Sequence, residues 1–316
     1  MLKNRKIIFL LFAMISFMII GSISQSRADE KPKVTMVLKD LDTQYWQILK
    51  AGAEKGFKDF GIQGKIVATK AESYYEQGRS LEEEYESNPD ALILAPYDST
   101  IVPVLEQLHE KNEIPVVLVD QNVAWDSKAA FIGTDNRELG QKAGSLLASE
   151  LQPGNKVAFI GGGMETPVFK ERISGARSSL EDAGIIIAAE SLGIYDDEKT
   201  VKKEMTKVVT KHPDIKGVIA THDLVAIQAI EALEENGVSI PVIGADGITD
   251  MLELIEEGKI SGTVAQNPFD MGYLSVEMAA KAIKGETVEE FVDTGVDIII
   301  KENVRQRLDF LNKRLK

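Results

Sequence analysis

Short apolar runs rich in valine and isoleucine alternate with stretches of helical periodicity along most of this chain. Strands that are apolar on both faces and are joined by helical segments are typical of parallel sheets covered by helices. The apolar runs form two successive sets, at 34–38, 66–69, 91–95, 116–119 and 130–133, and then at 157–160, 185–189, 217–220, 242–244 and 262–265. The helical pattern lies between and beside them, at 45–60, 101–111, 138–150, 225–236 and 271–284. The alternation predicts an α/β fold.

The number of runs favours two doubly wound parallel-sheet lobes. One (α/β)₈ barrel would alternate in the same way, but the runs outnumber its eight strands. The segment at 131–136 has the character of a crossing between two halves, and no low-complexity linker separates them. A chain of 316 residues is long enough for two domains. We therefore expect two lobes joined by a short, ordered hinge.

The first 28 residues have the layout of a secretory signal peptide. Three basic residues within the first six positions precede an uncharged apolar run at 7–20, and a small-x-small pattern ends at Ala28. This predicts export, with cleavage after Ala28, to a periplasmic or membrane-associated extracytoplasmic location. Because the apolar run is also near the lower length limit of a membrane-spanning helix, a retained anchor is the alternative.

The composition excludes several classes of protein. The chain has no cysteine, so it has no disulfide framework, thiolate metal site or lipid-modified cysteine. A net charge of −14 argues against a nucleic-acid partner, because phosphate backbones are bound by clustered lysine and arginine. The tail at 302–316 is helical in pattern and basic, and we expect it to pack as a terminal helix, with docking to a partner as an alternative.

The motifs of common enzymes are absent from the sequence. The glycines at 161–163 lack the lysine and hydroxyl residue of a phosphate loop, and no Gly-x-Ser-x-Gly elbow occurs. The three histidines, His109, His212 and His222, do not have the spacing of metal ligands. We expect no catalytic residue, no metal and no cofactor.

Polar and aromatic side chains follow the predicted strands, where open parallel sheets bind ligands. Asp120 and Asp246 each come directly after an apolar run, and each carboxylate can accept two hydroxyl hydrogen bonds. Arg172 offers a planar set of donors, while Tyr45 and Trp46 offer flat apolar faces for a sugar ring. As alternatives, the aspartates could cap helices, Arg172 could lie on the surface, and the two carboxylates could form a glycosidase pair.

The chain resembles the ribose-binding-protein family of type I periplasmic solute receptors over residues 32–301. The motifs that carry the resemblance are Tyr45-Trp46, Val-Leu-Val-Asp120, Phe-Ile-Gly-Thr-Asp135-Asn136, Lys-Glu-Arg172-Ile-Ser-Gly175, Val-Ile-Gly-Ala-Asp246-Gly247 and Val-Ala-Gln266-Asn-Pro. Each motif is weak alone, and their order and spacing make the set specific.

The resemblance implies three crossings, near 134–135, 266–267 and 296–297. The N-terminal lobe would then comprise 29–134 and 267–297, and the C-terminal lobe 135–266 and 298–316. Ligand contacts are implied at Tyr45, Trp46, Asp120, Arg172, Asp246 and Gln266, with Thr43, Asp42 and Tyr195 as further candidates. The sequence departs from ribose receptors at Gln121, where an arginine is usual, and at His222, where an amide is usual. These departures place ribose itself in doubt and keep both residues as candidate contacts.

The implied function is the capture of a small polyhydroxylated ligand, expected to be a monosaccharide, by closure of the two lobes. A monomer would deliver this sugar or polyol to the membrane permease of an ABC importer. A co-receptor that presents its ligand to a membrane sensor kinase or chemoreceptor is the alternative. A sugar-responsive repressor would need a DNA-binding segment before the body, where the export signal stands instead.

Overall fold

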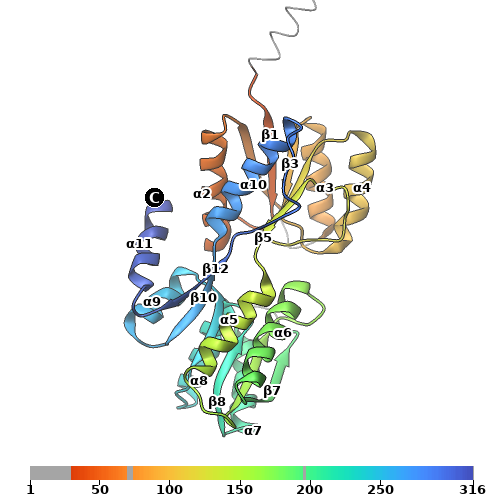
Figure 1. The fold of residues 1–316 in the computed structure, drawn as a ribbon. Helices are drawn as coiled ribbons and strands as arrows, with labels where there is room; N and C mark the ends of the chain where they lie inside the picture. Colours follow the sequence, from red (N-terminus) through yellow and green to blue (C-terminus); the bar gives the residue numbers. More distant parts are fainter. Residues whose placement is uncertain (1–29, 70–73, 195–196, 316) are drawn as a thin grey trace, which may run out of the picture.

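The computed structural model describes residues 30–69, 74–194 and 197–315, and it forms two α/β lobes placed end to end (Figure 1). The expected pair of doubly wound lobes is confirmed. The expected signal segment 1–28 and the candidate contact Tyr195 lie outside the described residues. Among the described residues, no helix is both long and apolar enough to span a bilayer.

The first lobe contains a six-stranded sheet in the order β11-β5-β4-β3-β1-β2. Its strands are β1 (Lys33–Leu38), β2 (Gln63–Ala68), β3 (Ala91–Leu94), β4 (Val116–Val119), β5 (Ala130–Gly133) and β11 (Phe291–Asp293), all paired in parallel. Its helices are α2 (Gln44–Asp59), α3 (Tyr74–Glu86), the short η1 (Ser99–Ile101), α4 (Val102–Lys111) and α10 (Pro268–Ile283).

The second lobe repeats this plan in the order β12-β10-β9-β8-β6-β7. Its strands are β6 (Lys156–Gly161), β7 (Ile186–Leu192), β8 (Ile215–Ala220), β9 (Val242–Asp246), β10 (Gly262–Gln266) and β12 (Val296–Ile300), the last antiparallel to β10. Its helices are α5 (Asn136–Ala148), α6 (Pro167–Asp182), α7 (Glu198–Lys211), α8 (Asp223–Glu235) and α9 (Thr249–Glu257).

Each sheet is buried on both faces, as the continuous apolar runs predict. In the first lobe, α2 and α10 pack on one face and α3 and α4 on the other. In the second lobe, α5 and α6 cover one face, and α7 and α8 cover the other. In both sheets the chain order reverses beside the first strand of the lobe, and this places a crevice at the carboxyl ends of the strands.

The lobes are joined by three crossings (Figure 1). The first connects β5 to α5 at residues 134–135, and the second connects β10 to α10 at Asn267. The third connects β11 to β12 at residues 294–295, so the expected position at 296–297 is wrong by two residues. Gly295 adopts a positive φ of 68° there, which allows the chain to turn before β12 begins at Val296.

The tail forms α11 (Val304–Arg314) and packs against both lobes. Its buried residues Val304, Leu308 and Leu311 share an apolar cluster with Ile48 of α2 and with Leu252 and Ile255 of α9. Arg314 lies over the ring of Phe269 in α10, at 4.4 Å from its centroid. The expectation of a packed terminal helix is confirmed.

Candidate functional site

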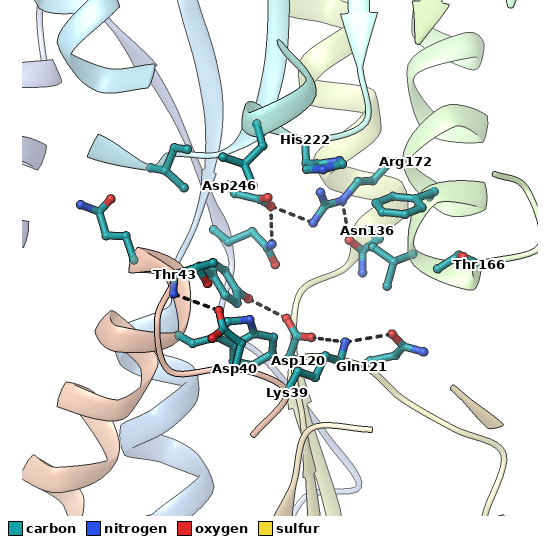
Figure 2. A pocket seen from close by; sticks show the side chains of 18 of the residues that line it. Lys39, Asp40, Thr43, Asp120, Gln121, Asn136, Thr166, Arg172, His222 and Asp246 are labelled. Atoms are coloured by element: carbon teal, nitrogen blue, oxygen red, sulfur yellow. Dashed lines mark hydrogen bonds and ion pairs between the residues drawn. The ribbon is translucent and has the colours of Figure 1, made fainter. Parts of the chain in front are cut away.

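A cavity of about 530 Å³ lies between the lobes at the carboxyl ends of the strands (Figure 2). Its lining includes Lys39, Tyr45, Trp46, Asp120 and Gln121 from the first lobe. The opposite wall includes five polar residues of the second lobe, Asn136, Arg172, His222, Asp246 and Gln266. The two walls therefore present polar side chains to one another across a common space.

Asp120 is the centre of the polar group on the first lobe. Its Oδ1 accepts a hydrogen bond of 2.7 Å from the Tyr45 hydroxyl, and its Oδ2 lies 3.1 Å from Lys39 Nζ. Lys39 also donates to Gln121 Oε1 at 3.2 Å and lies 5.5 Å from the centroid of the Trp46 ring. The carboxylate is thus neutralised by one cation, and its position is fixed by two donors.

Tyr45 remains a hydrogen-bond donor at physiological pH. Burial of its hydroxyl, and then the negative charges of Asp120 and Asp246, raise the pKa of Tyr45 well above the ordinary value of 10.0. The neighbouring ring of Trp46 meets it edge to face, with centroids 5.2 Å apart. The pair therefore supplies a phenolic donor and an apolar ring surface side by side.

Arg172 and Asp246 form the corresponding pair on the second lobe. Arg172 Nη2 lies 3.0 Å from Asp246 Oδ1, and Gln266 Nε2 donates to the same oxygen at 2.6 Å. Arg172 also donates to Asn136 Oδ1 and to the carbonyl oxygen of Thr221, both at 2.9 Å. The side chain of Arg172 is only 6% exposed, so the surface alternative for this arginine is wrong.

Close contact between α5 and α6 brings Arg172 next to Asn136. A Cβ on Gly140 of α5 would lie 2.0 Å from the carbonyl oxygen of Arg172, and one on Gly175 of α6 would lie 2.1 Å from that of Arg137. A side chain at either glycine would push the helices apart. The two glycines therefore hold the donors of Arg172 at the edge of the cleft.

The two cleft aspartates share an unusual backbone conformation. Asp120 has a φ of 69° and Asp246 a φ of 106°, whereas most residues with side chains have negative φ. Such conformations concentrate at functional sites. Neither residue occupies an N-cap position, and the helix that follows Asp246 is capped by Ile248. The alternative that these aspartates cap helices is therefore wrong.

His222 is both the N-cap residue of α8 and part of the cavity wall. Its ring stacks on Phe169, with centroids 5.4 Å apart and planes 16° from parallel. Its Nδ1 is 3.0 Å from the hydroxyl of Thr221, and the exposed fraction of the residue is 9%. The two rings form a flat surface on the second lobe.

The structure brings most of the predicted contacts together and leaves one aside. Thr43 lines the cavity, whereas Asp42 does not and instead donates its backbone N–H to Asp40 Oδ1. Lys39, Asn136 and Phe169 line the cavity but were not among the predicted contacts. Lys39 directly follows the first strand, so its position in the sequence was the signal that could have identified it.

The sequence matches the periplasmic binding protein domain family over residues 34–287. It is 30% identical to the ribose import binding protein RbsB of Bacillus subtilis, over 84% of this chain and 87% of that protein. It is 26% identical to the D-ribose/D-allose-binding protein of Pseudomonas aeruginosa, over 90% of this chain and 93% of that protein.

Solved structures of solute-binding proteins share the fold of this chain. A carbohydrate transporter solute-binding protein of Agrobacterium radiobacter, in complex with D-arabinose, superposes with a TM-score of 0.79 at 26% identity, covering 90% of this chain and 99% of that one. A solute-binding protein of Actinobacillus succinogenes with bound D-allose gives 0.81 at 25% identity, covering 87% of this chain and all of that one. The chain belongs to the periplasmic binding protein family, in its ribose-binding-like type I branch.

Proposed function

We propose that this chain is an exported sugar-binding protein of an ABC importer, and that it binds a neutral monosaccharide between its lobes. The observation that carries the proposal is the facing pair of carboxylate–cation groups, Asp120 with Lys39 and Asp246 with Arg172. Hydroxyl groups of a sugar are well bound by carboxylates and amides whose charge is compensated. The sugars named for the relatives, ribose, allose and arabinose, support this class of ligand.

The charge balance of the cleft supports a neutral ligand over an anionic one. Each of the two cations already lies within 3.1 Å of a carboxylate oxygen. Two further carboxylates, Asp40 and Asp250, line the cavity. Among the described residues that line the cavity, both cations are already paired, so a sugar phosphate or uronic acid would meet an excess of negative charge there and lose solvation.

In the proposed mechanism, the sugar shifts the population toward closed lobes because only the closed form contacts it from both sides. The aromatic face of Trp46 and the stacked pair of Phe169 and His222 would pack against the two faces of the ring. The closed protein would then deliver the sugar to the membrane permease. We propose no catalytic step and no cofactor, since both carboxylates are held in ion pairs and act as hydrogen-bond acceptors.

Thermal melting of residues 29–316 tests the proposal. A ligand that binds only the folded state raises the melting midpoint in a concentration-dependent manner. We expect such an increase with at least one of D-ribose, D-allose, D-arabinose or D-galactose, and none with ribose 5-phosphate or glucuronate. A well-folded protein that responds to none of the neutral sugars would contradict the proposal.

A further inference from the structure

Asp223 is a fully buried carboxylate that lies behind the cleft wall. It is the first residue of α8, its exposed fraction is 0%, and it does not line the cavity. Burial, and then the charge of Asp246, raise the pKa of Asp223 well above its ordinary value of 3.8, against the opposing effect of its hydrogen bonds. A carboxylate in such a place is costly unless donors surround it.

Three donors converge on Asp223 from two other elements. Its Oδ2 accepts from the backbone N–H groups of Gly247 at 2.6 Å and Ile248 at 3.0 Å, both in the connection after β9. Its Oδ1 accepts from the hydroxyl of Thr263 in β10 at 2.7 Å. Asp223 therefore joins the start of α8, the connection 247–248 and β10 at one point.

The surrounding backbone leaves room for this carboxylate. A Cβ on Gly244 of β9 would lie 2.3 Å from Asp223 Oδ1, so any larger residue would displace the carboxylate. A Cβ on Gly247 would lie 2.3 Å from the Cβ of Ala265 in β10. The connection after β9 is thus pressed against β10, and the Asp223 carboxylate occupies the space that a side chain at position 244 would need.

The elements that Asp223 joins carry two residues of the cleft. Asp246, with its φ of 106°, immediately precedes Gly247, whose φ is 73°. Gln266 lies three residues beyond Thr263 on β10 and donates to Asp246 Oδ1 at 2.6 Å. The position of the Asp246 carboxylate relative to Arg172 and Gln266 therefore depends on how this connection is held.

We propose that Asp223 is a positioning residue for ligand binding: it holds residues 246–248 against β10 and so aims the Asp246 carboxylate into the cleft. It acts through Asp246 and does not touch the ligand. The expected effect of Asp223 on sugar affinity rests on the proposed function. Its effect on residues 246–248 does not depend on any ligand.

Two substitutions separate the role of the oxygen acceptors from that of the charge. Asp223→Ala removes every acceptor and leaves the N–H groups of Gly247 and Ile248 without this partner. Asp223→Asn keeps one oxygen for those N–H groups and can turn its amide toward the Thr263 hydroxyl. In the protein without sugar, we expect hydrogen exchange at the Gly247 and Ile248 amides to accelerate by at least about tenfold in Asp223→Ala and to be largely restored in Asp223→Asn.

Calorimetric binding supplies the second measurement, with whichever of D-ribose, D-allose, D-arabinose and D-galactose raises the wild-type melting midpoint most. Asp223→Ala is expected to weaken binding by about tenfold or more, with most of the affinity recovered in Asp223→Asn. In an Asp246→Ala background, the same change is expected to cost less than about threefold, because the group it positions is gone. Equal losses in both backgrounds, or a loss under threefold in the wild-type background, would overturn the proposal.

A control variant and a fallback variant complete the design. Leu233→Ala, at the other end of α8, removes a buried side chain and should lower the melting midpoint without changing affinity or loop exchange. If Asp223→Ala does not fold, Thr263→Val serves instead, because it removes one of the three donors to Asp223. It is expected to weaken sugar binding in the wild-type background and to weaken it less in the Asp246→Ala background. If none of the four neutral sugars binds the wild-type protein, the proposed function fails, while the exchange measurement still decides whether Asp223 holds the loop.

Discussion

At the scale of single residues, the cleft is built from charges that are compensated before a ligand arrives. Lys39 and Arg172 each pair with one aspartate, and Gln266 and Tyr45 each donate to one. Lys39 also places a cation beside Gln121, the position where the resemblance to ribose receptors implies an arginine. The first lobe thus keeps a cation at this end of the cleft, supplied by a different strand.

Replacement of Lys39 with methionine tests this interpretation. Both partners of the Lys39–Asp120 pair are mostly buried, with side chains 17% and 15% exposed, so the variant leaves the carboxylate uncompensated. We expect sugar affinity to fall by about tenfold or more, measured by calorimetry. Lys50→Met, which removes an exposed lysine on α2, is the matched control and should bind as the wild type does.

The raised pKa of Tyr45 makes a prediction about alkaline stability. The folded protein keeps the phenol proton after the unfolded chain has lost its own, so the stability from the neutral phenol is complete below about pH 10 and declines above it. Urea unfolding at about pH 9 and pH 11 should therefore show a larger loss for the wild type than for Tyr45→Phe. Equal losses in the two proteins would mean that Tyr45 titrates normally in the folded state.

At the scale of elements, sequence predicted the bounds best for strands that are buried on both faces. β1, β3 and β4 coincide with continuous apolar runs, because each is covered by helices on two sides. β11 and β12 lie at sheet edges, with exposed residues and an aspartate within each strand, so neither is a fully buried apolar run and neither was predicted. Lys39 directly follows β1, but a lysine at a strand end is usually solvated, so it was not predicted as a cleft residue.

The C-terminal helix α11 makes an element-scale prediction at the hinge. Arg307 donates to Asn267 Oδ1 at 2.9 Å and to the Gln266 carbonyl, and Asn267 donates in turn to the Thr294 carbonyl at 3.1 Å. The arginine therefore ties the second crossing to the third. Arg307→Met should lower the unfolding free energy by about 1–3 kcal/mol in urea titrations.

The neighbouring Arg305 provides the control for that experiment. Its side chain is 75% exposed and pairs with Glu256 on α9. Arg305→Met should change the unfolding free energy by less than about 0.5 kcal/mol. Similar effects of the two substitutions would contradict a specific role for Arg307 at the crossings.

At the scale of the whole molecule, the two lobes have the same strand order and present equivalent strand ends to one another. This symmetry explains why Asp120 after β4 and Asp246 at the end of β9 face each other across the cavity (Figure 2). The alternation of strands and helices predicted the two lobes. The rule that open parallel sheets bind ligands at the carboxyl ends of their strands predicted both aspartates as cleft residues. The pairing of each aspartate with its cation depends on contacts between distant segments, which no local pattern encodes.

Calorimetric titration of the wild type and of Asp120→Ala and Asp246→Ala with D-ribose, D-allose, D-arabinose and D-galactose tests the central claim most directly. The account predicts that the wild type binds one molecule of at least one of these sugars. It also predicts that each substitution weakens that binding by at least about tenfold, because the sugar needs both lobes. Near-wild-type affinity in both variants would contradict a ligand held between the two carboxylates.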